Sequence, residues 1–116
     1  MVEFVNLTPH EIVIVGEDGE IKQKISPSGK IARVKVERIK LNEIGGISVY
    51  LHFYGDVEGL PMPLHKTVYI VSSLVAQATR DRDDVVFPDT SPEGVVRDSE
   101  GKIIGVKALA RWSEER

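Results

Sequence analysis

Cysteine is absent from this chain of 116 residues, so it can hold no disulfide framework, thiol nucleophile or thiolate metal site. A membrane span is missing too, because no apolar run approaches the ~20 residues that a transmembrane helix needs. The first residues carry neither a basic leader nor the apolar run of a signal peptide. We therefore expect a soluble, cytoplasmic protein without a membrane partner.

A strong charge of either sign is also lacking. The 15 Lys and Arg residues nearly balance the 18 Asp and Glu residues, which gives a net charge of -3. This balance argues against broad binding to a nucleic-acid polymer or an anionic membrane. The length and the 41% hydrophobic content suit one domain that spans 1–116.

Familiar catalytic and metal-binding motifs are missing. The chain has no nucleophile elbow, helical HExxH motif or dinucleotide glycine fingerprint, and its three histidines have no compact ligand spacing. Ser26–Lys30 ends in Gly-Lys, but it lacks the spaced glycines and the helix of a phosphate loop, so it is interpreted as a turn. We expect no metal and no cofactor.

The sequence consists mainly of short stretches rich in β-branched residues, separated by turn residues. They predict a hairpin over 11–25 with a polar edge strand, and a second hairpin over 95–106. Apolar alternation also predicts strands near 3–7 and 31–41, the latter with a change of phase that indicates a bulge or bend. A turn over 42–46 and a long connection over 55–66 complete this half of the chain.

The clearest alternation in the chain runs from Ile47 to Tyr54. Its odd positions are apolar and are expected to face the core, whereas its even positions carry Tyr50, His52 and Tyr54. Aromatic and imidazole rings suit stacking on a base or contact with a sugar, but they also cover ordinary half-buried sheets. Both interpretations of this polar face stay open.

Thr67–Pro88 is the segment around which the prediction is organised. Its apolar start predicts a central strand, and Ser72 or Ser73 is placed to cap a short helix that ends near Thr79. A charged turn over 80–84 and a strand over 85–88 follow. The two strands can pair in a parallel or an antiparallel manner.

The start of this helix is the predicted ligand site. Free backbone N–H groups and the positive end of the helix dipole attract anions, and Ser72 and Ser73 would add hydroxyl groups. Arg80, Arg82 or Arg97 would supply a bidentate clamp on a phosphate or carboxylate. Alternatively, Arg80 and Arg82 only neutralise the aspartates of the 80–84 turn.

The elements together predict a β-rich α+β fold. We expect about seven strands in a strongly bent antiparallel or mixed sheet, or in a partly open barrel, with one short helix.

Several motifs along nearly the whole chain resemble a family of small proteins from bacteria and their phages. The pattern includes NLTPH at 6–10, ARV at 32–34, VEGLP at 57–61 and YIVSxLVAxA at 69–78. The resemblance implies a compact, cytoplasmic, often phage-associated protein. It carries no catalytic residue over to this chain.

The preferred hypothesis from the sequence is a small binding protein for an anionic small molecule, best matched by a nucleotide, which in a phage could sequester a nucleotide signal. The small size would favour a homo-oligomer that shares pockets across subunits. The candidate ligand-binding residues are His10, Tyr50, His52, Ser72, Ser73, Arg80, Arg82 and Arg97.

Two alternatives belong to other classes. A small hydrolase or isomerase would use His10 or His52 with a nearby carboxylate. A phage structural or protein-interaction module would use the polar edge hairpin and the long Gly/Pro loop to contact a protein.

Overall fold

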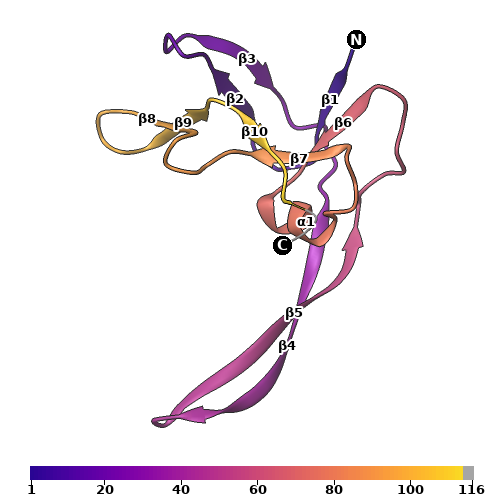
Figure 1. The fold of residues 1–116 in the computed structure, drawn as a ribbon, viewed down its shortest axis with the longest axis vertical. Helices are drawn as coiled ribbons and strands as arrows, with labels where there is room; N and C mark the ends of the chain where they lie inside the picture. The colour runs from indigo at the N-terminus through magenta and orange to yellow at the C-terminus, as the bar shows by residue number, and fades with distance from the viewer. Residues whose placement is uncertain (114–116) are drawn as a thin grey trace.

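The computed structural model describes residues 1–113 and shows two regions, which we call the body and the arm. The body comprises 1–32 and 59–113, and the arm is the hairpin Arg33–Glu58 that extends away from it (Figure 1). No helix in the described part of the chain is long and apolar enough to cross a membrane.

The first sheet of the body has four strands in the order β1-β6-β7-β10. β1 (Glu3–Asn6) and β7 (Val85–Pro88) flank β6 (Thr67–Ile70), and both run parallel to it. The short β10 (Leu109–Ala110) is antiparallel to β7. The prediction of a central, buried strand at the start of Thr67–Pro88 is therefore confirmed, and its open question of pairing direction is answered as parallel.

The second sheet contains both predicted hairpins of the body, in the order β3-β2-β9-β8. β2 (Ile12–Val15) pairs with β3 (Ile21–Ile25), which is the edge strand as expected. β9 (Ile103–Val106) pairs with β8 (Val95–Arg97) and joins the two hairpins through a parallel contact with β2.

Helix α1 (Ser73–Ala78) connects the parallel strands β6 and β7, close to its predicted bounds. Ser72 is its N-cap, and the Ser72 hydroxyl accepts a hydrogen bond of 3.3 Å from the Val75 amide. The helix is therefore stabilised at its start by the residue type that commonly fills this position.

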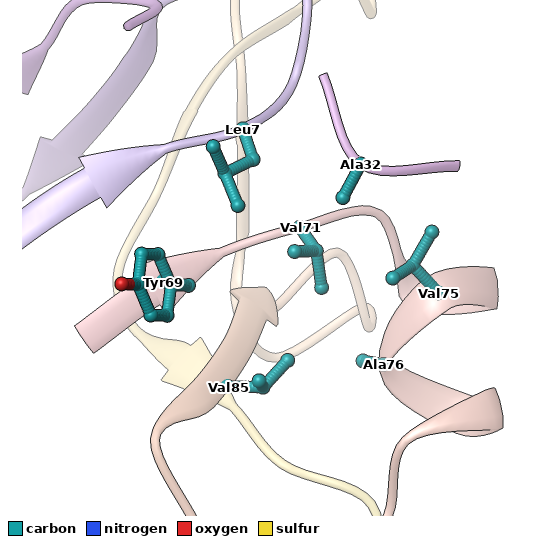
Figure 2. Packing of buried hydrophobic residues seen from close by; sticks show 7 residues of the cluster. All are labelled: Leu7, Ala32, Tyr69, Val71, Val75, Ala76 and Val85. Atoms are coloured by element: carbon teal, nitrogen blue, oxygen red, sulfur yellow. The ribbon is translucent and has the colours of Figure 1, made fainter. Parts of the chain in front are cut away.

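The core of the body is small and lies between the first sheet and α1. Figure 2 shows apolar side chains from β6, α1, β7 and the loops pointing into this space: Leu7, Ala32, Tyr69, Val71, Val75, Ala76 and Val85. Ile12, Ile25 and Ile70 form a second buried cluster, where the two sheets of the body meet. Burial of these side chains provides the main stabilisation of the body.

Asn6 is the one buried polar residue in this core among the described residues. Its side-chain amide nitrogen donates to the carbonyls of His10 and Ile25 at 2.8 and 3.0 Å. Its side-chain oxygen accepts from the amide and the hydroxyl of Thr8 at 2.9 and 2.7 Å. Asn6 thereby fixes the Thr8–His10 turn and ties it to β3, so this part of the NLTPH pattern has a structural role.

The arm consists of β4 (Arg33–Ile44) and β5 (Ile47–Glu58), which form an antiparallel two-stranded sheet of their own. Its base lies against α1, where the Tyr54 hydroxyl donates to the side-chain oxygen of Gln77. Because of the arm, the radius of gyration is 16.7 Å, whereas a compact domain of this length has about 13 Å. The chain is therefore less compact than expected.

The arm corrects several predictions made from the sequence. The odd positions of 47–54 do not face the core: Ile47 is 70% exposed and Leu51 is 52% exposed. The two strands continue pairing through 42–44 and 55–58, so the turn shrinks to Gly45–Gly46 and the connection begins after Glu58. β4 has register shifts between Val34 and Val36 and between Lys40 and Asn42, but its pairing is continuous from Val36 to Lys40, where the apolar pattern changes phase. A bulge is therefore present in the strand, but not at the predicted position.

The fold class is confirmed in its broad terms, as a β-rich α+β protein with one short helix in the described residues. Residues 1–113 form ten strands instead of about seven. These strands lie in three separate sheets, none of which closes into a barrel.

Candidate functional site

A hollow of about 330 Å³ lies beside α1 and is walled by three segments that are far apart in the sequence. They are the end of the NLTPH pattern at 7–9, the ARV pattern with Ile31 at 31–34, and the helix start at Ser72, Leu74 and Val75. Parts of the NLTPH, ARV and YIVSxLVAxA patterns thus meet in one place.

The backbone of Leu7 brings these segments together. Its amide donates to the carbonyl of Ile70 at 2.8 Å, which places 7–9 beside the end of β6. Its carbonyl accepts from the amide of Ala32 at 3.0 Å, which places the first residue of β4 on the other side. The hollow therefore follows from the parallel β1–β6 pairing and from one further backbone contact.

Arg33 is the one charged residue in the wall of this hollow. Its side chain is exposed and makes no hydrogen bond, ion pair or ring contact with any other residue in 1–113. An unpaired guanidinium beside apolar walls is suited to binding a carboxylate or phosphate, since its five N–H donors match those groups in a bidentate manner.

The hydroxyl groups in the wall differ in their availability. The Thr8 hydroxyl donates its hydrogen to the side-chain oxygen of Asn6, so it has no donor left for a ligand and contributes only to the shape of the hollow. The Ser72 hydroxyl accepts from the Val75 amide, and its own hydrogen has no acceptor among the described residues. Ser72 therefore retains one hydrogen-bond donor for a ligand.

The helix itself gives little support to the expected anion site. α1 has six residues, fewer than two turns at 3.6 residues per turn, so few peptide dipoles are aligned. Its N-cap hydroxyl already satisfies one of the free amides. The hollow beside the helix, with Arg33, is a better candidate than the helix start.

A second hollow of about 510 Å³ lies on the arm side of the helix. Its wall contains His52 and Tyr54 from the polar face of the arm, together with Val36, Phe53 and Leu74. Leu74 belongs to both walls, so the two hollows adjoin. Of the residues expected to bind a ligand, Ser72 and His52 are therefore brought to neighbouring sites.

The other candidates lie elsewhere. Arg82 forms a bidentate ion pair with Asp84, with its Nε 2.9 Å and its Nη2 2.6 Å from the carboxylate oxygens. The hydrogen bond from Arg82 holds the pKa of the Asp84 carboxyl below its usual value and raises the pKa of Arg82. For Arg82 the neutralising interpretation is supported, and it makes this arginine a structural residue.

Arg80 and Ser73 contact the C-terminal segment. Arg80 donates to the carbonyl of Ser113 at 3.2 Å and lies 5.5 Å from the ring centre of Trp112. The Trp112 indole donates to the carbonyl of Ser73 at 3.0 Å and stacks on Phe87. These contacts hold Trp112 and Ser113 against α1.

Three candidates are not in the wall of the hollow at Arg33. Arg97 donates to the carbonyl of Gly101 at 2.6 Å in the turn between β8 and β9. His10 lines a separate hollow of about 320 Å³ between 10–13 and β9. Tyr50 lies on the arm beneath the guanidinium of Arg38, which is 3.7 Å from its ring centre.

Within residues 1–113 these histidines form no hydrogen-bonded acid-base pair. His10 and His52 line different hollows, and neither imidazole is hydrogen-bonded to a carboxylate within residues 1–113. The described residues also contain no group of three or more side chains that could hold a metal ion.

Arg33 is the residue that reasoning from the sequence underrated. Its position directly after the 26–30 turn and at the start of a strand was visible, but its proximity to Ser72 depends on the backbone contacts of Leu7. A scan against protein-family models, a search of curated proteins and a search of solved structures found no match.

Proposed function

We propose that this protein binds an anionic small molecule, with a nucleotide as the best-matched class, and that Arg33 binds the anion. The single observation that carries the proposal is an unpaired guanidinium in the wall of a hollow that is otherwise uncharged. A group of this kind gains charge-assisted hydrogen bonds from a phosphate without having to break an existing ion pair.

The surroundings of Arg33 favour a nucleotide over a simple inorganic anion. Apolar side chains of Leu7, Val34 and Leu74 form much of the wall, and the adjoining hollow adds the rings of His52 and Tyr54. A phosphate at Arg33 with a base or sugar directed along Leu74 would use both kinds of surface. In a phage-associated protein, such binding would serve to sequester a nucleotide signal.

Isothermal titration against a panel of mono-, di- and cyclic nucleotides tests this proposal. We expect at least one member to bind at micromolar concentration. Arg33→Gln should weaken that binding about tenfold to a hundredfold, which corresponds to losing a hydrogen bond to a charged group worth about 1.5–3 kcal/mol. Arg33→Lys should recover only part of the loss, because an ammonium group cannot form the bidentate contact.

Arg97→Gln is the matched control, since it removes an arginine of similar exposure from the far hairpin. It should bind the same nucleotide as tightly as the wild type. The proposal fails if no nucleotide binds at micromolar concentration, or if Arg33→Gln binds as well as Arg97→Gln.

A further inference from the structure

The arm presents two faces of opposite chemistry. Residues directly opposite each other in the hairpin share a face, so the register Ile39↔Leu51, Asn42↔Val49 and Ile44↔Ile47 gathers apolar side chains on one side. We call the apolar residues of this side the apolar face: Ile39, Ile44, Ile47, Val49, Leu51 and Phe53. Glu37 and Asn42 lie on the same side, opposite Phe53 and Val49. The other side is mainly polar: it carries Arg38, Lys40, His52 and the two tyrosines, with Val36 opposite Tyr54.

The apolar face is uncovered in the single chain. Apart from Val49, its members are 40–70% exposed, and they expose roughly 500 Å² together, near the upper end of the ~300–600 Å² of the largest patch on a typical monomer. Leu41, which has no partner at the β4 register shift, is a further apolar side chain of the arm that is 63% exposed. Ile44 and Ile47 even flank the turn at the tip, where polar residues are usual.

The arm also has few contacts with the body that would stabilise it. A two-stranded hairpin in water is marginally stable at best, and β4 and β5 have 12 residues each, about 40 Å of strand at ~3.3 Å per residue. Only the base of the arm contacts α1. A second layer on the apolar face would supply the missing stabilisation.

We propose that this layer is the same face of a second copy of the chain, with the two arms packed face to face and running in opposite directions. The available area fits a homodimer. Typical interfaces are about 57% apolar, so about 500 Å² of apolar surface suits an interface of roughly the 800 Å² per partner that a standard complex buries.

Charge also fits self-association. The arm contains four basic residues (Arg33, Lys35, Arg38, Lys40) and four acidic ones (Glu37, Glu43, Asp56, Glu58), so it is neutral, whereas the whole chain has a net charge of -3. Two arms therefore approach each other without net repulsion. In the opposed arrangement the apolar tip of each arm covers the Ile39–Phe53 region of the other, and Lys35 and Glu37 lie at the rim, as charged residues do in interfaces.

Sedimentation or light scattering tests the dimer. We expect the wild type to have twice the mass of the 12.9 kDa chain. Leu51→Lys places a charge in the middle of the apolar face and should weaken the dimer at least a hundredfold. Ser48→Lys is the matched control: Ser48 is three residues away on the opposite face, opposite Glu43, and this variant should remain a dimer.

Because Leu51 is already exposed in the single chain, both variants should keep the thermal melting of the body, which circular dichroism would check. A wild type that is monomeric at 100 µM would overturn the proposal. A Leu51→Lys variant that dimerises as tightly as Ser48→Lys would overturn it too.

Cross-linking separates arm-to-arm packing from an arm that docks on the partner's body. The chain has no cysteine, so a single introduced cysteine reports on its own position. Ile44→Cys, Ile47→Cys, Val49→Cys and Leu51→Cys would be treated with a bismaleimide that spans about 10 Å, the spacing of packed sheets. At least one should form a cross-linked dimer and Ser48→Cys should not; a dimer that none of the four cross-links would contradict the arrangement.

Discussion

The body and the arm use similar residues in opposite ways. In the body, Ile70 and Val71 are completely buried between a parallel sheet, a short helix and a second sheet. In the arm, Ile44 and Ile47 are more than 60% exposed on a sheet of two strands. An apolar alternation therefore indicates an apolar face of a strand pair, but it does not indicate whether the same chain buries that face.

The largest expected effect is a loss of packing in the body. Ile70→Ala should lower the free energy of unfolding by about 2–5 kcal/mol, because it leaves a cavity where the two sheets of the body meet. The same change in the arm, Ile44→Ala, should alter it by less than about 0.5 kcal/mol when measured on the monomeric Leu51→Lys background. Urea denaturation measures both. Equal losses of unfolding free energy for the two variants would contradict the view that Ile70 is packed in a core and Ile44 is not.

The second-largest effect on the unfolding free energy is expected for the buried Asn6. Asn6→Ala removes the partner of the Thr8 amide and of two carbonyls, so we expect a loss of about 2 kcal/mol in the same assay. The control is Asn42→Ala, an exposed asparagine of the arm, which should change the unfolding free energy by only a few tenths of a kcal/mol on the monomeric Leu51→Lys background. A neutral Asn6→Ala would mean that the NLTPH turn holds its shape without this network.

The ion pair of the body should give a smaller, pH-dependent effect. The Arg82 hydrogen bond lowers the pKa of Asp84 in the folded state, so its stabilisation is present above the pKa of the unfolded chain and is lost as the pH falls through the folded pKa. Asp84→Asn should cost about 1 kcal/mol at pH 7, and the difference from the wild type should shrink as the pH falls below about 4.

Asp83→Asn serves as the control for this pair, because Asp83 is exposed and forms no salt bridge within residues 1–113. It should leave the unfolding curves unchanged at both pH values. A gap between wild type and Asp84→Asn that stays constant from pH 7 to pH 3 would assign the effect to packing instead of charge.

The smallest effect is expected for the ion pair of the arm. Lys40 and Glu43 are 2.9 Å apart, but about half of each side chain is exposed. Solvent screens such a pair, so Lys40→Ala should change the unfolding free energy by less than about 0.5 kcal/mol in urea denaturation at 0.15 M salt. A loss of unfolding free energy as large as that of Asp84→Asn would show that the ion pairs of the body and of the arm contribute equally to stability.

The elements of the body could be predicted from the sequence because their signals are local. The turn at Gly16–Gly19 predicts the β2–β3 hairpin, and Ser72 followed by Leu74 and Val75 predicts the helix. The parallel pairing of β6 and β7 could not be predicted, since 14 residues between the strands permit either direction.

The candidate site was harder to predict. The sequence points to Ser72 through a helix dipole, which is small for a helix of six residues, and it does not show that Arg82 is bonded to Asp84. Arg33 and Ser72 are 39 positions apart and meet only because Leu7 bonds to both Ile70 and Ala32. Such tertiary contacts leave no local pattern in the sequence.

Amide hydrogen exchange of the wild type and of Leu51→Lys, at one protein concentration, tests the central difference between the regions most directly. If a second copy covers the arm, Arg33–Ile39 should exchange faster in the variant, whereas Thr67–Ile70 in the body should exchange equally in both. Equal exchange of Arg33–Ile39 in the two proteins would contradict our account, because it would mean that the arm is stable without a partner.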